Sequence, residues 1–141
     1  MERVDYVDTF IAVADDCPAA CGTVPPGAES AAARAYRLIA AAPYRHTSGD
    51  VIFAVHAERL GIPEAERAAA RAAFYARSQA CLRASDLGRR YGWGIHADSD
   101  GRIALVGRET ADCADFAAGR RRASSGKPVA LTRAMARSRA R

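Results

Sequence analysis

Residues 81–107 gather most of the side chains in this sequence that could take part in chemistry, and they read CLRASDLGRRYGWGIHADSDGRIALVG. They include a thiol, an imidazole and the only Trp of the 141 residues. An indole ring beside guanidinium and imidazole donors suits a small planar or anionic ligand, or a protein partner. The candidate ligand-binding residues are Arg83, Ser85, Arg90, Tyr91, Trp93 and His96. Core packing is the competing interpretation of Trp93, because Trp side chains are usually well buried.

Cys81 is the candidate nucleophile, with His96 or His56 as its proton acceptor. Arginines close in sequence, such as Arg83, favour the thiolate form of a cysteine, and a neighbouring His is a common base for it. Leu87 stands where a C-x5-R phosphatase loop needs Arg, and the motifs G-x-S-x-G, H-E-x-x-H and the P-loop are absent. A thiol-dependent enzyme is therefore the alternative, and a non-catalytic binding or interaction module is favoured.

Three patterns imitate metal or cofactor sites without the context that such sites need. Residues 92–97 match the letters G-x-G-x-x-A of dinucleotide-binding proteins, but a turn follows them where that site requires a helix. The acidic residues of 98–109 resemble a calcium loop, yet Ile103 stands where the loop needs Gly. Cys17 and Cys21 have C-x3-C spacing, but no second ligand pair follows at zinc spacing. We expect no metal and no cofactor.

The central element is a predicted β-hairpin over residues 91–107. Trp93 is predicted to point to one face of its first strand and His96 to the other, because side chains alternate along a strand. Residues 98–101, Asp-Ser-Asp-Gly, are typical of a turn. A lone two-stranded hairpin is only marginally stable in water, so the rest of the chain must cover its apolar face.

The flanking segments supply these covering elements. A β-branched and aromatic run predicts a strand at 6–14 that can join the hairpin. Helices are predicted at 29–42, 47–60, 63–77, 85–90 and 111–118. Thr47 and Asp50 suit the start of the second of these helices, and Gly61 suits its end. The third carries a stripe of small residues that predicts close packing on a neighbour: Ala65, Ala68, Ala69, Ala72 and Ala76.

These elements predict a single globular α+β domain over residues 1–119, with about three helices packed on a small antiparallel sheet. Three helices followed by a hairpin is also the order of a winged-helix protein, which is the alternative fold. In that alternative the helix at 63–77 presents basic residues to the major groove of DNA. Glu64 and Glu66 at its start count against this function as a nucleic-acid binder.

The positive charge of the sequence is concentrated at its end. The formal net charge is +5 at pH 7. Residues 120–141 contain seven Arg, Lys127 and no acidic residue, a charge of +8, which leaves −3 for residues 1–119. Ordering this tail costs roughly 1.5 kcal/mol per residue, more than its few large apolar side chains return. We therefore expect a disordered basic tail. Its charge suits non-specific contact with nucleic acid or an anionic surface, but an Arg-biased extension without such a function is the favoured interpretation.

Two absences in the sequence bear on location. The N-terminal residues Met1-Glu2-Arg3 are not followed by the apolar region of a signal peptide. The longest strongly apolar run, 51–55, is far too short to cross a bilayer. Four Cys in such a chain suggest reduced thiols, so we expect a soluble cytoplasmic protein with no membrane contact.

Three blocks of the sequence carry a resemblance to a known family. They are TFIAVADDCPA, PYRHTSGDVIFAVHAER and, above all, ARSQACLRASDLGRRYGWGIHADSDGRIALVG. Residues 5–116 resemble a family of small bacterial proteins that contain a domain of unknown function, and the tail lies outside the resemblance. The family implies no activity, cofactor or catalytic residue for this sequence.

Overall fold

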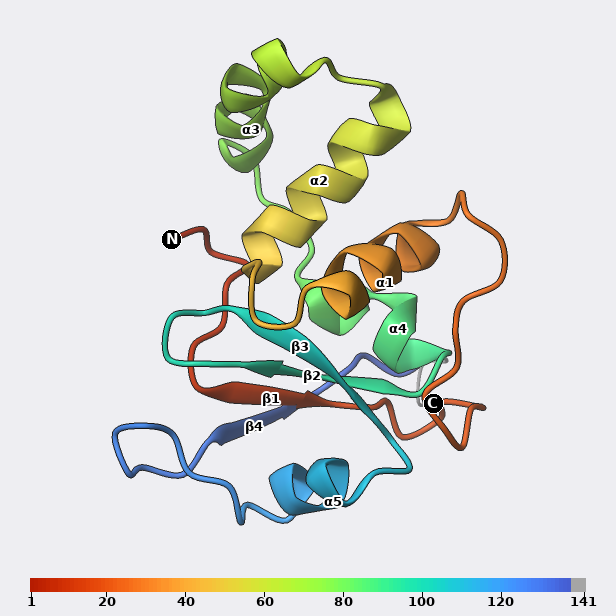
Figure 1. The fold of residues 1–141 in the computed structure, drawn as a ribbon, viewed down its shortest axis with the longest axis vertical. Coiled ribbons are helices and arrows are strands. Elements are labelled where there is room, and N and C mark those ends of the chain that lie inside the picture. The colour runs from red at the N-terminus through yellow and green to blue at the C-terminus, as the bar shows by residue number, and fades with distance from the viewer. Residues whose placement is uncertain (138–141) are drawn as a thin grey trace.

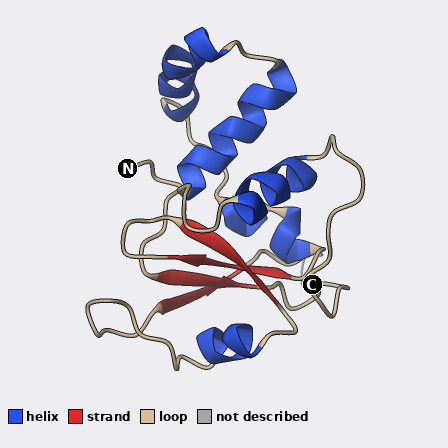
Figure 2. Ribbon diagram, viewed as in Figure 1, coloured by secondary structure: helices blue, strands red, loops and turns tan. Residues whose placement is uncertain are grey.

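A four-stranded mixed sheet forms the centre of the protein (Figures 1 and 2). The computed structural model describes residues 1–137, which contain five α-helices and four strands. The strands are β1 (Thr9–Ala12), β2 (Trp93–Ala97), β3 (Ile103–Gly107) and β4 (Ala130–Arg133). The helices are α1 (Ala31–Ala41), α2 (Ser48–Leu60), α3 (Arg67–Tyr75), α4 (Asp86–Arg89) and α5 (Ala111–Ala117). The α+β class is confirmed, but the sheet is mixed rather than antiparallel.

The predicted hairpin is confirmed as β2 and β3, which pair antiparallel over their whole length. The Asp98 carboxylate closes the turn, because it accepts hydrogen bonds of 2.9 Å from the backbone N–H groups of Asp100 and Arg102. Gly101 has a φ of +77°, a conformation that glycine adopts without strain. β1 pairs antiparallel with β2 and so becomes the third strand beside the hairpin.

Strand β4 contradicts the expectation that residues 120–141 form a disordered tail. It lies parallel to β1 at the edge of the sheet, and the Ala130 N–H donates to the Asp8 carbonyl over 2.9 Å. Val129 and Ala134, at its two ends, are buried. The expectation of disorder weighed side-chain burial alone and left out the backbone hydrogen bonds that a free sheet edge offers.

Acidic side chains from elsewhere in the chain pair with three of the arginines in this segment. The ion pairs are Arg120–Asp115 (2.8 Å), Arg121–Asp112 (3.3 Å) and Arg133–Asp15 (2.9 Å). Such exposed pairs contribute little stability each, but they remove the repulsion expected of a run of like charges. Residues 138–141 of the predicted tail lie outside the described residues.

The two faces of the sheet bury separate apolar clusters, because side chains alternate along β1. Ile11 packs on the side of α1, α2 and α4, whereas Phe10 packs on the side of α5 (Figure 1). The rings of Phe10 and Phe116 stack with centroids 4.7 Å apart. Along β2, Trp93 joins the first cluster and His96 contacts Phe116 on the opposite face, as the alternation predicts.

The predicted ends of α2 are confirmed. The Thr47 hydroxyl accepts a hydrogen bond from the Asp50 N–H at 3.1 Å, and the Asp50 carboxylate accepts one from the Thr47 N–H at 3.0 Å. This reciprocal pair satisfies two backbone donors at the start of the helix. Gly61 ends it in the left-handed conformation, with a φ of +64°. Of the helices in residues 1–137, α2 is the longest, and none has both the length and the apolar composition to cross a bilayer.

The Ala stripe of α3 does not pack as predicted. Helices α2 and α3 project together from the sheet (Figure 1), and α3 has no buried residue. Its contacts with α2 come instead from larger side chains, such as Phe74, whose ring lies 4.4 Å from that of His56. The small residues therefore lie on the outer side of α3, where Ala68, Ala69 and Ala72 are exposed.

Candidate functional site at the edge of strand β3

Strand β3 forms one edge of the sheet, and part of this edge is covered by the chain itself. The Ile103 N–H donates to the His46 carbonyl, and the Ile103 carbonyl accepts from the Tyr44 N–H, both at 2.9 Å. Thr47 adds an isolated antiparallel bridge to Arg102. Beyond Ile103 the outer side of β3 borders a cavity.

This cavity, which we call the edge cavity, has a volume of about 470 Å³. Its walls include Pro43, Tyr44, Trp93, Leu105, Val106 and Phe116. Leu105 and Val106 are half-buried, whereas the other three residues of β3 are buried. The wall also carries Glu109, Thr110, Asp112 and Arg121, so rings and charged groups share one concave surface, as they do in many binding sites.

Tyr44 stands where the chain leaves β3, in a strained backbone conformation. Its φ is +59°, and Asp8 is the other non-glycine residue in the described chain with a positive φ. Such a conformation costs about 1–3 kcal/mol for a bulky residue and often marks a functional site. The backbone pairing of residues 44–47 with β3 ends at Tyr44, and Pro43 before it lies on the wall of the edge cavity.

A hydrogen bond fixes the ring of Tyr44 on the cavity wall. The Tyr44 hydroxyl lies 2.8 Å from Nδ1 of His96. Burial and the nearby charge of Arg121 lower the pKa of His96, which favours the neutral imidazole. Burial raises the pKa of Tyr44, so the phenol keeps its proton at neutral pH.

Phe116, on α5, forms the opposite part of the wall. Its ring lies between neighbours that restrict its motion: the ring centroid is 4.5 Å from that of His96 and 4.7 Å from that of Phe10. The guanidinium of Arg121 lies 4.4 Å from the same ring centroid, in cation–π geometry. Packing against these neighbours therefore fixes the position of the Phe116 ring on the wall of the edge cavity.

Trp93 packs against the chain and also reaches the edge cavity. Its Nε1–H donates to the Thr23 carbonyl over 2.9 Å, and its ring centroid lies 5.7 Å from that of Tyr36. Gly22 lies so close that an added Cβ would stand 2.8 Å from the indole ring. The indole is thus packed under residues 22–23 and also lines the edge cavity.

The other predicted ligand-binding residues lie elsewhere. His96 lines a separate hollow of about 290 Å³ together with Asp8 and Ser99. The Ser85 hydroxyl caps α4. Three further residues of the predicted set, Arg83, Arg90 and Tyr91, do not line the edge cavity either. Arg83 donates to the Arg133 carbonyl at 2.7 Å, and the exposed Arg90 lies 3.9 Å from Asp86.

Cys81 and His96 are not brought together. Cys81 lines a groove of about 380 Å³ between α1, α2 and the segment 80–89, and its Sγ lies 3.4 Å from the Tyr6 hydroxyl. His96 packs on α5, on the opposite face of the sheet. Among residues 1–137, no group of three or more His, Cys, Asp or Glu side chains has the arrangement of a metal site.

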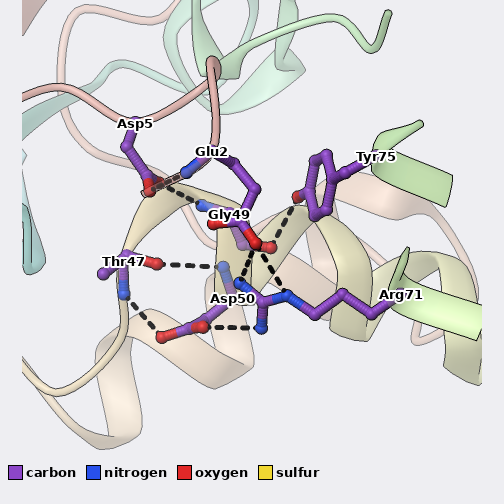
Figure 3. Close-up of polar contacts among 7 residues, drawn as sticks. All are labelled: Glu2, Asp5, Thr47, Gly49, Asp50, Arg71 and Tyr75. Atoms are coloured by element: carbon purple, nitrogen blue, oxygen red, sulfur yellow. Dashed lines mark hydrogen bonds and ion pairs between the residues drawn. The ribbon is translucent and has the colours of Figure 1, made fainter. Parts of the chain in front are cut away.

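A second polar cluster joins the N-terminal segment, α2 and α3 (Figure 3). Arg71 is bound by Glu2 at 3.0 Å and by Asp50 at 2.8 Å. The Tyr75 hydroxyl donates to the Gly49 carbonyl over 2.6 Å, and burial raises the pKa of Tyr75 to about 12. Because its charges are paired with one another, this cluster serves to attach α3 to α2.

The model of DUF6157, a family of unknown function, matches residues 1–134. The chain belongs to this family. The resemblance predicted from the sequence is thereby confirmed, and it extends beyond residue 116 through β4. Neither a search of curated proteins nor a search of solved structures finds a significant match.

In this member of DUF6157, sequence reasoning missed two walls of the edge cavity. Tyr44 precedes Leu105 by 61 positions in the sequence. Phe116 follows Leu105 by 11 positions, on a short helix, and neither residue belongs to a functional motif. One signal was present: Pro43 before Tyr44 predicts a break in the helix and a turn of the chain. Nothing in the sequence indicates that this turn meets β3.

Proposed function

We propose that this protein is a non-catalytic binding module and that its ligand lies in the edge cavity. The observation that carries the proposal is the fixed position of the Tyr44 ring, which is held by His96 beside an open strand edge. A strained residue whose ring is also kept in place by a hydrogen bond is a feature that packing alone does not require. The proposal includes a cytoplasmic location, where the four free cysteines stay reduced.

The charges around the edge cavity favour an uncharged ligand over an anionic one. Arg121 is paired with Asp112 at 3.3 Å, so its charge is already partly neutralised. Glu109, another wall residue, accepts a hydrogen bond from the Gly22 N–H at 3.0 Å. With two carboxylates and one guanidinium on the wall, an anion meets more repulsion than attraction.

The two alternative functions have less support. A thiol-dependent enzyme needs a base next to Cys81, and the hydrogen-bond partner of its thiol is the Tyr6 hydroxyl. A winged-helix-like nucleic-acid binder needs available cations on α3, and Arg71 is paired with both Glu2 and Asp50. Non-specific contact with nucleic acid through the C-terminal segment has less support because Arg120, Arg121 and Arg133 are paired with acidic side chains.

Two-dimensional NMR with a planar probe tests the proposal. Trp93 is the only Trp, so its indole N–H gives a single resonance that reports on the edge cavity. We expect 2-naphthol to shift this resonance in a saturable way and its anionic analogue, 2-naphthoate, to bind more weakly. The absence of any saturable shift with either probe would contradict the proposal.

A matched pair of variants locates the binding. Tyr44→Asn removes the ring, and Asn tolerates the left-handed backbone. We expect it to weaken 2-naphthol binding about tenfold, which corresponds to about 1.4 kcal/mol. Tyr91→Asn removes a half-buried ring outside the edge cavity and should leave the affinity unchanged. Equal affinities of the two variants would place the probe elsewhere.

A further inference from the structure

The backbone of Leu105 offers an unused donor and acceptor to the edge cavity. In an antiparallel pair, successive residues point their N–H and C=O groups alternately toward and away from the partner strand. The backbone groups of Ile103 form hydrogen bonds on the side away from β2, with Tyr44 and His46. The Arg108 N–H forms its hydrogen bond on the side of β2, with the Gly92 carbonyl. The backbone N–H and C=O of Leu105 therefore point away from β2, toward the edge cavity. No residue in the described chain forms a hydrogen bond with either group.

The chain itself shows that this edge accepts an added strand. Residues 44–47 pair with the start of β3 through two backbone hydrogen bonds and an antiparallel bridge. The pairing stops at Tyr44, since its positive φ and the preceding Pro43 turn the chain away. The open stretch at Leu105 continues the same edge, directly beyond the place where the covering segment leaves it.

Pockets for side chains lie on both sides of this open stretch. Leu105 and Trp93 lie on the face that packs against α1 and α2, whereas Val106 and Phe116 lie on the face of α5. All four line the edge cavity. Because side chains alternate along an extended peptide, one bound there would place successive residues against the two sets of rings.

We propose that the edge cavity binds an extended, uncharged apolar peptide of a partner protein, which pairs with the backbone of Leu105 as an additional strand. The inference rests on the proposed function and names its ligand. The backbone of the peptide satisfies both polar groups of Leu105, whereas a planar apolar molecule that covers them leaves both without partners. The carboxylates of Glu109 and Asp112 disfavour an acidic peptide.

A second copy of this chain does not fit the same edge. Two β3 strands that meet edge to edge would each bring their own residues 44–47, which cover the edge at Ile103. These segments would collide with the partner strand unless the pairing were limited to Leu105. The open stretch therefore suits a peptide with free ends on either side of its paired residue.

A display library of random linear dodecapeptides, selected against the full chain, tests the inference. We expect enriched peptides to alternate apolar and aromatic residues without Pro at their centre, and to shift the Trp93 indole resonance on binding. Failure of the library to yield any binder, or enrichment of acidic peptides, would overturn the inference. Saturable binding of 2-naphthol in the same protein would show that the proposed function still holds.

Proline substitutions at the two edges of the sheet give a matched comparison. Leu105→Pro removes the outward N–H of β3, and Pro is tolerated in edge strands where the N–H faces away from the sheet. Leu131→Pro makes the same change in β4, at the opposite edge. We expect at least a tenfold loss of peptide affinity in Leu105→Pro and none in Leu131→Pro. Equal affinities of the two variants would overturn the inference.

Amide exchange gives a second measurement that needs no variant. In the free protein the Leu105 N–H should exchange much faster than those of Ala104 and Val106, which point toward β2. A selected peptide should slow the exchange of Leu105 at least tenfold. A peptide that shifts Trp93 without protecting Leu105, or a dimer of the chain that protects it without peptide, would overturn the inference.

Discussion

The Tyr44 hydroxyl and Nδ1 of His96 lie 2.8 Å apart, although 52 positions separate the two residues in the sequence. The bond joins the turn before α2 to the second strand of the sheet. Burial and the charge of Arg121 lower the pKa of His96 and so favour its neutral form. The wall of the edge cavity is therefore coupled to a titratable group.

This coupling predicts a loss of stability in mild acid. The folded pKa of His96 is lowered from its ordinary value of 6.5, so the unfolded chain takes up the proton first as the pH falls. The contribution of His96 to the free energy of unfolding is complete above about pH 6.5. It declines as the pH falls from there toward the lowered pKa of the folded state. Urea unfolding of the protein between pH 7.5 and 5 measures this decline.

His96→Gln is the control for this prediction, since it removes the titration and keeps a polar side chain. The difference in free energy of unfolding between the protein and the variant should shrink as the pH falls. His46 and His56 are present in both proteins and cancel in the comparison. Parallel pH profiles would show that the pKa of His96 is not lowered by folding.

Gly94→Ala should destabilise the sheet by about 1–3 kcal/mol, the usual cost of overpacking a core. A Cβ at this position would overlap the far end of the Phe10 ring, which is fully buried and stacked on Phe116. Thermal unfolding measures the loss. The double variant Gly94→Ala/Phe10→Leu should lose less than the sum of its single changes, because the shorter side chain relieves the overlap. Additive losses would argue against the contact.

The local parts of the fold follow from the sequence because short-range chemistry decides them. Thr47 and Asp50 form the predicted capping pair, and Gly61 takes the predicted left-handed conformation. The turn at 98–101 forms as its residue types require. The opposite orientations of Trp93 and His96 follow from strand alternation alone.

Long-range pairing is what the sequence does not reveal. Ala130 pairs with Thr9, 121 positions earlier, in an Arg-rich segment whose composition suggests disorder. The position of Tyr44 beside β3 depends likewise on where α1 and α2 pack. The predicted site was divided for this reason, because Cys81 and His96 are close in sequence but lie on opposite faces of the sheet.

Arg71→Met should lower the free energy of unfolding by about 1–2 kcal/mol, between the values for exposed ion pairs and for buried hydrogen bonds to charged groups. The variant leaves the half-buried carboxylates of Glu2 and Asp50 without their cation. Arg90→Met is the control, because its exposed pair with Asp86 spans 3.9 Å and should contribute under about 0.5 kcal/mol. Equal losses in urea unfolding would mean that the cluster in Figure 3 does not anchor α3.

Brief alkylation with iodoacetamide near neutral pH should modify the cysteines in order of their exposure. Cys21 is exposed and should react first, whereas Cys17 and Cys113 are buried. Burial also raises the pKa of Cys113, which lowers its thiolate fraction. Half-buried Cys81 should react no faster than free cysteine, as mass spectrometry of the peptides can show. Faster reaction at Cys81 would revive the thiol-dependent enzyme.

Removal of β4 should destabilise the whole sheet. A chain that ends at Pro128 loses Val129 and Ala134, both buried, and the strand that pairs with β1. Full burial of an apolar side chain such as Val contributes about 1.5–3 kcal/mol, and each backbone hydrogen bond contributes about 0.5–1.5 kcal/mol. Their combined loss is a large part of the 5–15 kcal/mol that stabilises a typical domain. A disordered tail would contribute nothing of this kind.

A chain that ends at Arg137 is the length control, because it keeps every residue of β4. Thermal unfolding and amide exchange of β1 should separate the two truncated chains. In the shorter chain the amides of Phe10 and Ala12 lose the strand on their outer side and should exchange faster. An unchanged midpoint together with unchanged protection of β1 would contradict the parallel pairing. Such a result would mean that residues 129–134 behave as a tail, because the loss of a buried Val129 and of a paired strand should lower stability.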